Sequence, residues 1–232
     1  MTNHGRHNGF TLVEVLVAVT IFAIAISTLL GSFNMVISNI DPMKTGLDNY
    51  EMGQNTMDRI QKDLMSLCLT PDPIYTQPGL EGFDHPDRFR FVSEKKLLDG
   101  NSFSHLRFAS FEHLAFDKDQ KNRIGIITYY VESSEDGTIV LKRSDIGSVF
   151  FNETVEYNTK NDPVLCEKIT ALELIFIDQE GNIFENWDSD SSNFDFSTPY
   201  SIKIKLEIGD QKKSDLFATT IVLPIIREKN DS

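Results

Sequence analysis

The chain opens with a short polar stretch that is followed by a long apolar one. Residues 1–9 are polar and contain no acidic residue. No charged residue occurs between Glu14 and Asp41, and most of the intervening residues are apolar. About twenty apolar residues in a helix cross the hydrocarbon core of a bilayer. The pattern therefore predicts a leader over residues 1–9 and a transmembrane helix over residues 10–40.

A second helical pattern follows the apolar segment. Apolar residues recur at steps of three, four or seven, which predicts an amphipathic helix over residues 41–70. The expected packing face consists of Met43, Leu47, Tyr50, Met57, Ile60, Leu64 and Leu67. Pro42 lacks a backbone donor and is expected to bend a continuous helix, while Gly53 is expected to weaken it. Pro71 ends the predicted helix.

The pattern changes to an alternation of period two in the rest of the chain, which predicts a β-rich domain over residues 71–226. The expected strand pairs are 124–131 with 138–143, 169–177 with 182–187, and 202–208 with 216–223. The tail, residues 227–232, is expected to be loose. The predicted fold class is α+β, with a long N-terminal helix, half transmembrane and half amphipathic, packed on antiparallel β-sheet.

An ordinary secretory signal peptide is one interpretation of the first thirty residues, but three features argue against it. The apolar run is longer than the usual 7 to 15 residues, residues 31–34 offer no small-x-small cleavage site, and Glu14 lies near the start of the run. A plain signal anchor explains the first two features and leaves Glu14 unexplained.

Glu14 is costly in a membrane. A carboxylate inside the hydrocarbon costs roughly 2.5 to 3.5 kcal/mol on insertion scales, so an intramembrane Glu is expected to have a function and a partner. If the chain is cut before Phe10, the new α-amine lies about one helical turn from Glu14, in the same chain or in a neighbour. Pairing with that amine would neutralise both charges.

The segment GFTLVEVLVA, residues 9–18, resembles the class III signal of type IV pilins and pseudopilins. The resemblance implies cleavage between Gly9 and Phe10 by a prepilin peptidase and N-methylation of Phe10. It also implies that Glu14, the fifth mature residue, directs docking into a filament. Arg6 precedes the span, and positive residues favour the cytoplasmic side, so the domain is expected in the periplasm, held by a single pass through the inner membrane.

The chain as a whole resembles the J-type minor pseudopilin of the type II secretion system. The similarity is carried by residues 57–64, 128–131, 141–143 and 169–178 and by the lone Trp187. It implies a place in the tip complex of the pseudopilus, which initiates assembly and supports protein export across the outer membrane. The implied partners are the I- and K-type pseudopilins, the major pseudopilin and the inner-membrane assembly platform.

Two alternatives stay open. A minor pilin of a type IV pilus or a DNA-uptake system would carry the same N-terminal signal. A membrane-anchored domain that binds a ligand or has enzymatic activity would keep residues 1–9 uncut.

Composition and motifs limit the partners, activities and binding sites that we expect for this chain. The net charge of −13 and the pI near 4.8 argue against a nucleic-acid partner, because phosphate binding needs clustered Lys and Arg. No phosphate loop, nucleophile elbow or metal motif is present, so we expect no enzyme activity, cofactor or metal site. Cys68 and Cys166 leave two alternatives, a disulfide or two buried free thiols.

The segment 188–193 spaces oxygen-bearing side chains as some calcium loops do. It lacks the central Gly and the late bidentate Glu of such loops. We therefore expect a solvated acidic loop, with calcium binding as the alternative.

Overall fold

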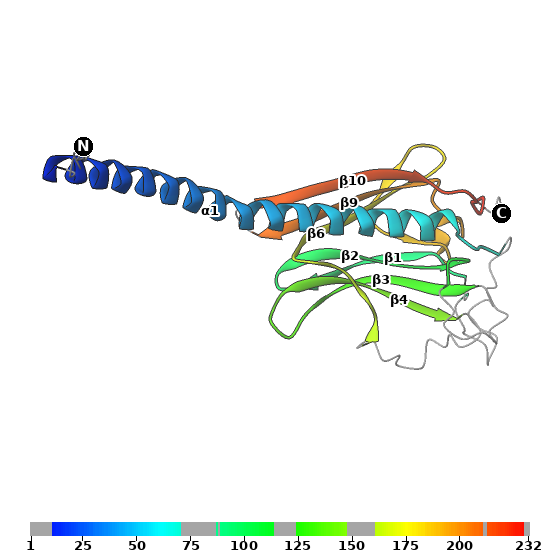
Figure 1. Cartoon of the computed structure of the whole chain (residues 1–232). Helices are drawn as coiled ribbons and strands as arrows, with labels where there is room; N and C mark the ends of the chain where they lie inside the picture. Colours follow the sequence, from blue (N-terminus) through cyan, green and yellow to red (C-terminus); the bar gives the residue numbers. More distant parts are fainter. Residues whose placement is uncertain are drawn as a thin grey trace, which may run out of the picture. The chain divides into compact units, whose positions relative to one another are not determined.

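The computed structural model describes residues 11–70, 87, 89–113, 124–147, 161–210 and 213–229, without the side chains of residues 36–46 and 213. It contains α-helix and antiparallel β-sheet, so the predicted α+β class is confirmed (Figure 1). The elements are α1 (Leu12–Met65), β1 (Val92–Leu98), β2 (Asn101–Ser110), β3 (Gly125–Ser133), β4 (Ile139–Gly147), β5 (Val164–Glu167), β6 (Ile169–Ile177), β7 (Ile183–Phe184), β8 (Trp187–Asp188), the 3₁₀ helix η2 (Ser192–Phe194), β9 (Ser201–Asp210) and β10 (Lys213–Val222).

The chain divides into two compact units, Met1–Asp48 and Asn49–Ser232. The helix α1 runs without interruption from Leu12 to Met65, and Pro42 lies inside it. This agrees with the single long N-terminal helix of the predicted fold, and the bounds expected for its transmembrane part, 10–40, and its amphipathic part, 41–70, stay predictions. A proline removes one intrahelical hydrogen bond. The fifty-four residues of α1 keep enough other bonds for the helix to continue through it.

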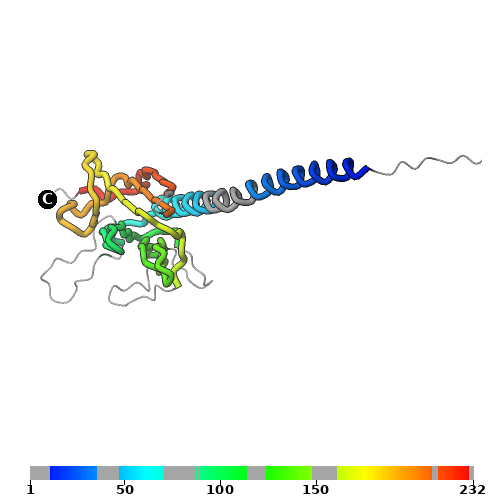
Figure 2. Tube along the Cα trace, turned by 90° about the vertical axis from the view of Figure 1, so that its left-hand side faces the viewer, coloured from blue at the N-terminus to red at the C-terminus, as the bar shows by residue number. Residues whose placement is uncertain are grey.

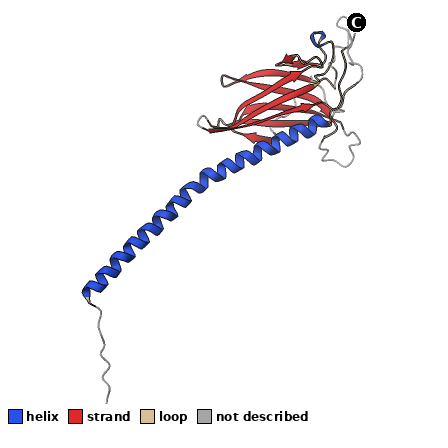
Figure 3. Cartoon of the chain, turned by 90° about the horizontal axis from the view of Figure 1, so that it is seen from above, coloured by secondary structure: helices blue, strands red, loops and turns tan. Residues whose placement is uncertain are grey.

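The strands form two antiparallel sheets. The six-stranded sheet has the order β5-β4-β3-β2-β1-β8, and the four-stranded sheet has the order β10-β9-β6-β7. In the second unit, the last turns of α1 lie against both sheets (Figures 1, 2 and 3). One hydrophobic core joins them, because α1 residues and the inner faces of both sheets belong to the same buried cluster.

The side of α1 that packs on this core differs from the predicted face. Met57, Ile60, Leu64 and Leu67 are buried as expected, whereas Leu47 and Tyr50 are more than half exposed. The buried stripe instead continues through Gly53, Thr56 and Asp63. These small or polar residues have the spacing of the apolar positions, but a hydropathy pattern does not include them.

The presence of a glycine at position 53 is explained by the close approach of α1 to β10. A Cβ atom at this position would lie 2.4 Å from ring atoms of Phe217 on β10. The glycine lets α1 and β10 come together, so its cost in helix propensity is offset by packing.

The strand predictions are confirmed for the β3–β4 and β9–β10 hairpins. Gly137 closes the first of these with a φ of 82°, as an Asp-Gly turn requires. The strand expected over residues 182–187 is wrong in part, because β7 pairs with β6 in one sheet while β8 pairs with β1 in the other. The β1–β2 hairpin and the short strand β5 were not predicted as separate elements.

The predicted loose tail is wrong at its first residue. Arg227 is 5% exposed, and its guanidinium donates to the carbonyl of Thr70 at 3.1 Å. It also pairs with the buried carboxylate of Asp87 at 3.1 Å. A charged residue near the end of a chain can therefore hold that end to the domain through a buried ion pair, and need not be solvated.

Candidate assembly site at the start of the helix

The residues of the predicted processing site lie at the beginning of α1. Gly9 and Phe10 fall outside the described residues, so cleavage between them and methylation of Phe10 stay predictions. Thr11 is the first described residue, and Glu14 lies in the first turn of α1.

Glu14 is folded back on the helix start. Its Oε2 atom accepts hydrogen bonds from the Thr11 backbone N–H at 2.9 Å and from the Thr11 hydroxyl at 3.0 Å. The Glu14 N–H in turn donates to Thr11 Oγ1 at 3.3 Å. This reciprocal arrangement is a capping box, in which two backbone donors that the helix leaves free are satisfied by side chains.

The capping box gives Glu14 hydrogen-bond partners but no counter-charge. A carboxylate in the hydrocarbon needs a partner, and Thr11 supplies only a neutral one. The α-amine expected after cleavage would arise at Phe10, one residue before Thr11. The geometry thus leaves Glu14 at the helix start with its charge uncompensated by its described contacts.

The segment that follows is suited to an apolar environment. Residues Leu12–Met35 form a candidate membrane span of 24 residues with a mean hydropathy of 2.5, and none of it is buried inside the protein. At about 1.5 Å per residue this helix is about 36 Å long, enough for a hydrocarbon core of about 30 Å.

The hydroxyl groups within the span are satisfied inside the helix. Thr20 donates to the Val17 carbonyl at 2.8 Å, and Ser27 donates to the Ala23 carbonyl at the same distance. Ser32 donates to Thr28 in the same way. Such bonds to the preceding turn hide polar groups that lipid could not satisfy.

A shallow apolar hollow lies beside Glu14. It is lined by Glu14, Val15, Ala18, Val19 and Phe22, which share one side of the helix. The small Ala18 side chain leaves room between its larger neighbours. The carboxylate of Glu14 therefore lies next to apolar side chains at the start of the span, where an ionised group is costly without a partner.

Comparison with known families agrees with this geometry. Residues 5–30 match the family described as the prokaryotic N-terminal methylation motif. A comparison with curated proteins finds no match to the chain. The chain therefore carries the class III signal of a type IV pilin-like protein. This signal, with the apolar helix, indicates processing by a prepilin peptidase, a single-pass anchor in the inner membrane and assembly with pilin-like partners.

A buried ionic cluster in the second unit was not found from the sequence. Asp63 on α1 is fully buried and pairs with Arg143 of β4 through a 2.6 Å contact to Arg143 Nε. The Tyr129 hydroxyl and Arg59 also bind this carboxylate. Burial raises the pKa of Tyr129, and the neighbouring Asp63 charge adds to the effect. The cluster joins α1 to two strands of the six-stranded sheet.

The pKa of Arg143 reflects the same cluster. Burial disfavours its charge, but the carboxylates of Asp63 and Asp145 outweigh this effect and raise the pKa of the guanidinium. The sequence contained a signal for this cluster. Asp63 occupies a helical position that the periodicity assigns to the core, and Arg143 lies within a predicted strand.

The two cysteines are free thiols in the structure. Burial raises the pKa of the Cys166 thiol to about 12, and Thr56 on α1 is its hydrogen-bonding neighbour. Thr56 and Met65, where α1 ends, are nine positions or roughly 14 Å apart along the helix, and Cys68 lies three residues beyond that end. A disulfide needs Cα atoms within about 7 Å, so this fold favours the alternative of two free thiols.

The segment expected to be a solvated acidic loop is instead tied into the domain. Asp188 accepts two hydrogen bonds from Arg90, at 2.8 and 2.7 Å, and Ser189 is fully buried. Asp190 accepts the Asp87 N–H at 3.1 Å. Burial opposes the charge of Asp188, but Arg90 outweighs it and lowers the pKa of that carboxyl. The prediction of a solvated loop is therefore wrong for residues 188–190, which serve as a structural link to Arg90 and Asp87, while Ser192 and Asn193 are exposed as expected.

A metal site is not found in the described part of the chain. In those ranges no group of three or more His, Cys, Asp or Glu side chains could hold a metal ion. The carboxylate of Asp188 is occupied by Arg90.

Proposed function

We propose that this protein is a minor pseudopilin of the J type in a type II secretion system. In this role its helix enters the pseudopilus, its domain lies on the periplasmic side, and the chain forms a tip complex with I- and K-type pseudopilins. The tip initiates assembly and supports export of proteins across the outer membrane. The proposal rests on the methylation motif at the start of an apolar helix that carries Glu14.

We further propose that the role is structural and not catalytic. Buried charged groups in the described domain are engaged in contacts that hold elements together. Asp63 pairs with Arg143, and Asp87 pairs with Arg227. This arrangement supports a domain that presents surfaces to neighbouring subunits.

The first experiment is the mass of the mature N-terminus. We expect the protein from cells with a prepilin peptidase to begin at N-methylated Phe10. Gly9→Ala is expected to leave most of the chain uncut. A wild-type chain that keeps residues 1–9 would contradict the proposal and favour a membrane-anchored ligand-binding or enzymatic domain.

The second experiment separates the charge of Glu14 from its capping role. Glu14→Gln keeps an acceptor for the Thr11 N–H but loses the charge, whereas Glu14→Ala loses both. If the carboxylate pairs with the α-amine of Phe10 during assembly, both variants are processed yet fail to co-purify with pilin-like partners. Normal assembly of Glu14→Gln would show that only the cap matters.

A minor pilin of a type IV pilus or DNA-uptake system is the second candidate, because the same signal serves all these systems. Deletion of the gene separates the two. Accumulation of exported proteins in the periplasm, with surface pili unchanged, supports the secretion role. Loss of pili or of DNA uptake with normal secretion supports the alternative.

A further inference from the structure

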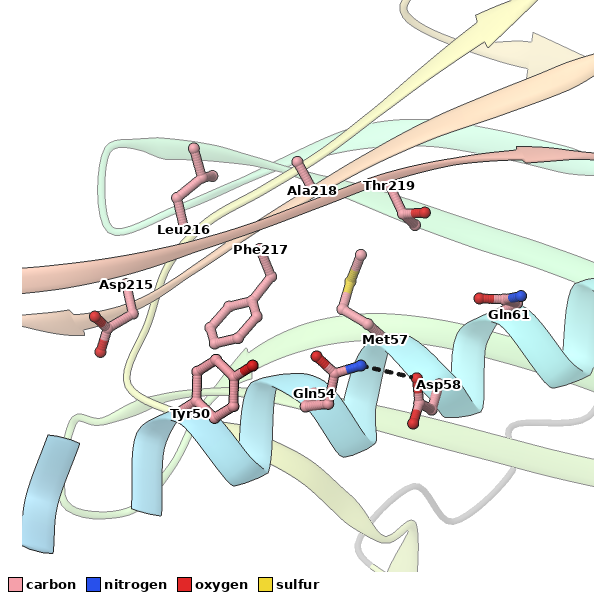
Figure 4. A pocket seen from close by; sticks show the side chains of 10 residues that line it. All are labelled: Tyr50, Gln54, Met57, Asp58, Gln61, Asp215, Leu216, Phe217, Ala218 and Thr219. Atoms are coloured by element: carbon pink, nitrogen blue, oxygen red, sulfur yellow. Dashed lines mark hydrogen bonds between the residues drawn. The ribbon is translucent and has the colours of Figure 1, made fainter. Parts of the chain in front are cut away.

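The second unit contains a groove between α1 and the edge strand β10 (Figure 4). Its helix wall includes Tyr50, Gln54, Asp58 and Gln61, and its other wall is formed by residues 215–219 of β10. The volume is about 510 Å³. From Tyr50 to Gln61 the helix rises about 16 Å, and residues 215–219 of a strand extend about 14 Å, so the two walls have matching lengths.

Within the ranges that the structure describes, the strand that forms this wall is a sheet edge with no further strand paired to it. β10 is the outermost strand of the four-stranded sheet, and its register with β9 is regular over all ten residues. Lys213 is the only basic residue of β10 and lies at its first position, and residues 214–222, which include the groove wall, contain neither a basic residue nor a proline. Leu216 is 60% exposed and Val222 is 51% exposed. Natural edge strands are usually protected by Lys, Pro or a bulge, and an edge without them is a template for another strand.

The hydrogen-bond register shows which main-chain groups face the free edge. Leu223 donates to the Tyr200 carbonyl at 3.0 Å, which makes this a hydrogen-bonded pair in the β9–β10 ladder. Such pairs alternate along antiparallel strands. The N–H and C=O groups of Leu216, Ala218 and Thr220 therefore point away from β9.

The charge of the groove selects its occupant. Asp58 and Asp215 line it, and none of its ten lining residues is Lys or Arg. The whole chain carries a net charge of −13. Pairing of two copies through this edge would bring these acidic side chains together, which is unfavourable. A basic segment of another protein has the complementary charge.

We propose that β10 and this groove bind an extended segment of a neighbouring pilin-like subunit, which adds a strand to the sheet and directs a Lys or Arg side chain toward Asp58 or Asp215. Main-chain hydrogen bonds to Leu216, Ala218 and Thr220 supply affinity, and the acidic groove supplies selectivity. This inference rests on the proposed function, because it takes the neighbour to be a subunit of the same filament.

A photo-cross-linking experiment in the native cell tests the proposal. A benzophenone side chain replaces Leu216 in the full-length chain, and mass spectrometry locates the cross-linked peptide. We expect an extended segment that contains Lys or Arg, in a protein with its own N-terminal methylation motif. An adduct on a second copy of this chain, on lipid, or on a helix of the partner overturns the proposal.

A proline variant shows whether the main chain is used. Ala218→Pro removes an N–H that points away from β9, so the β9–β10 ladder is kept, whereas Ala218→Val changes the side chain and keeps the N–H. We expect Ala218→Pro to lower the cross-linking yield about tenfold, as loss of a main-chain hydrogen bond does, and Ala218→Val to leave it unchanged. An equal yield in the two variants overturns strand addition.

Charge variants keep the test independent of the proline. Asp58→Lys and Asp215→Lys are expected to reduce the yield, while Asp58→Asn and Asp215→Asn have smaller effects. If Ala218→Pro fails to fold, these four variants decide the question. Cross-linking yields equal to that of the unchanged protein in all four overturn the proposal.

The N-terminal mass, measured in the same cells, separates the two proposals. A chain that begins at Phe10 and assembles normally without an adduct at position 216 leaves the proposed function standing and refutes the groove. A chain that keeps residues 1–9 refutes both.

Discussion

Single residues decide how the domain is held together, and Asp63 is the clearest example. Its carboxylate is fully buried and binds Arg143, Arg59 and Tyr129. A buried charge is tolerated only when paired and hydrogen-bonded, so loss of one partner is costly.

We predict that Asp63→Asn lowers the free energy of unfolding by about 3 kcal/mol, because Arg143 and Tyr129 lose a charged partner. Asp58→Asn is the matched control. Asp58 lies five residues earlier on the same helix, is exposed, and should change stability by no more than about 0.5 kcal/mol. Urea unfolding followed by the fluorescence of the lone Trp187 measures both. Equal effects of the two substitutions would contradict a stabilising role of the cluster.

His105 makes the domain sensitive to acid. Burial, assisted by the nearby charge of Lys96, lowers the pKa of His105 to about 4. Its ring also packs edge-on against Tyr130 at 5.6 Å. In the unfolded chain the group titrates near its ordinary pKa of about 6.5. The unfolded state therefore binds the proton first, and His105 disfavours the folded state as the pH falls.

We predict that the free energy of unfolding decreases by about 3 kcal/mol between pH 6.5 and pH 4 through this residue alone. Above pH 6.5 the effect vanishes. His105→Gln should remove this part of the pH dependence, so the difference between the two proteins isolates it. Parallel curves of stability against pH would show that His105 does not titrate as inferred.

At the scale of elements, close packing between α1 and β10 overrides helix propensity. Gly53 is unfavourable in an isolated helix, yet a side chain there meets the ring of Phe217. Phe217 in turn packs against Tyr50, with ring centroids 5.8 Å apart. The glycine is therefore a packing residue of the helix–strand contact.

We predict that Gly53→Ala lowers the stability by about 1 kcal/mol, because overpacking against Phe217 outweighs a propensity gain of about 1 kcal/mol. In a Phe217→Ala background the same substitution should stabilise the protein by about 1 kcal/mol. A double-mutant cycle measures the coupling directly. Stabilisation by Gly53→Ala in both backgrounds would show that the ring moves aside without cost.

At the scale of the whole molecule, the end of the chain closes the domain. Arg227 joins Thr70, just beyond α1, to Asp87 and to the carbonyl of Ser189. Lys229 adds an exposed pair with Glu180. Segments distant in sequence thus meet at one buried guanidinium.

We predict that a chain ending at Ile226 loses about 3 kcal/mol of stability, because Asp87 is left buried without its counter-ion. Among the described contacts, a chain that ends at Glu228 loses the pairs of the partly exposed Lys229 with Glu180 and Asp178, a change of about 0 to 1 kcal/mol. Thermal unfolding of the two truncated proteins provides the comparison. Equal stability would mean that Arg227 is dispensable.

Features that depend on local pattern could be predicted without a structure. The apolar run, the position of Glu14 and the Asp-Gly turn at Gly137 follow from hydropathy and turn chemistry, which act over a few residues. The fold class followed from the change of period along the chain.

The burial of polar residues and the identity of their contacts could not be predicted in this way, because they depend on how distant segments pack. Asp63, Arg143 and Arg227 look like surface residues in a sequence, because a charge becomes compatible with burial only when a distant partner reaches it. The strand expected at residues 182–187 divides between two sheets for a similar reason, since its pairing partners come from elsewhere in the chain. The free edge of β10 also depends on strand order, which local periodicity does not fix.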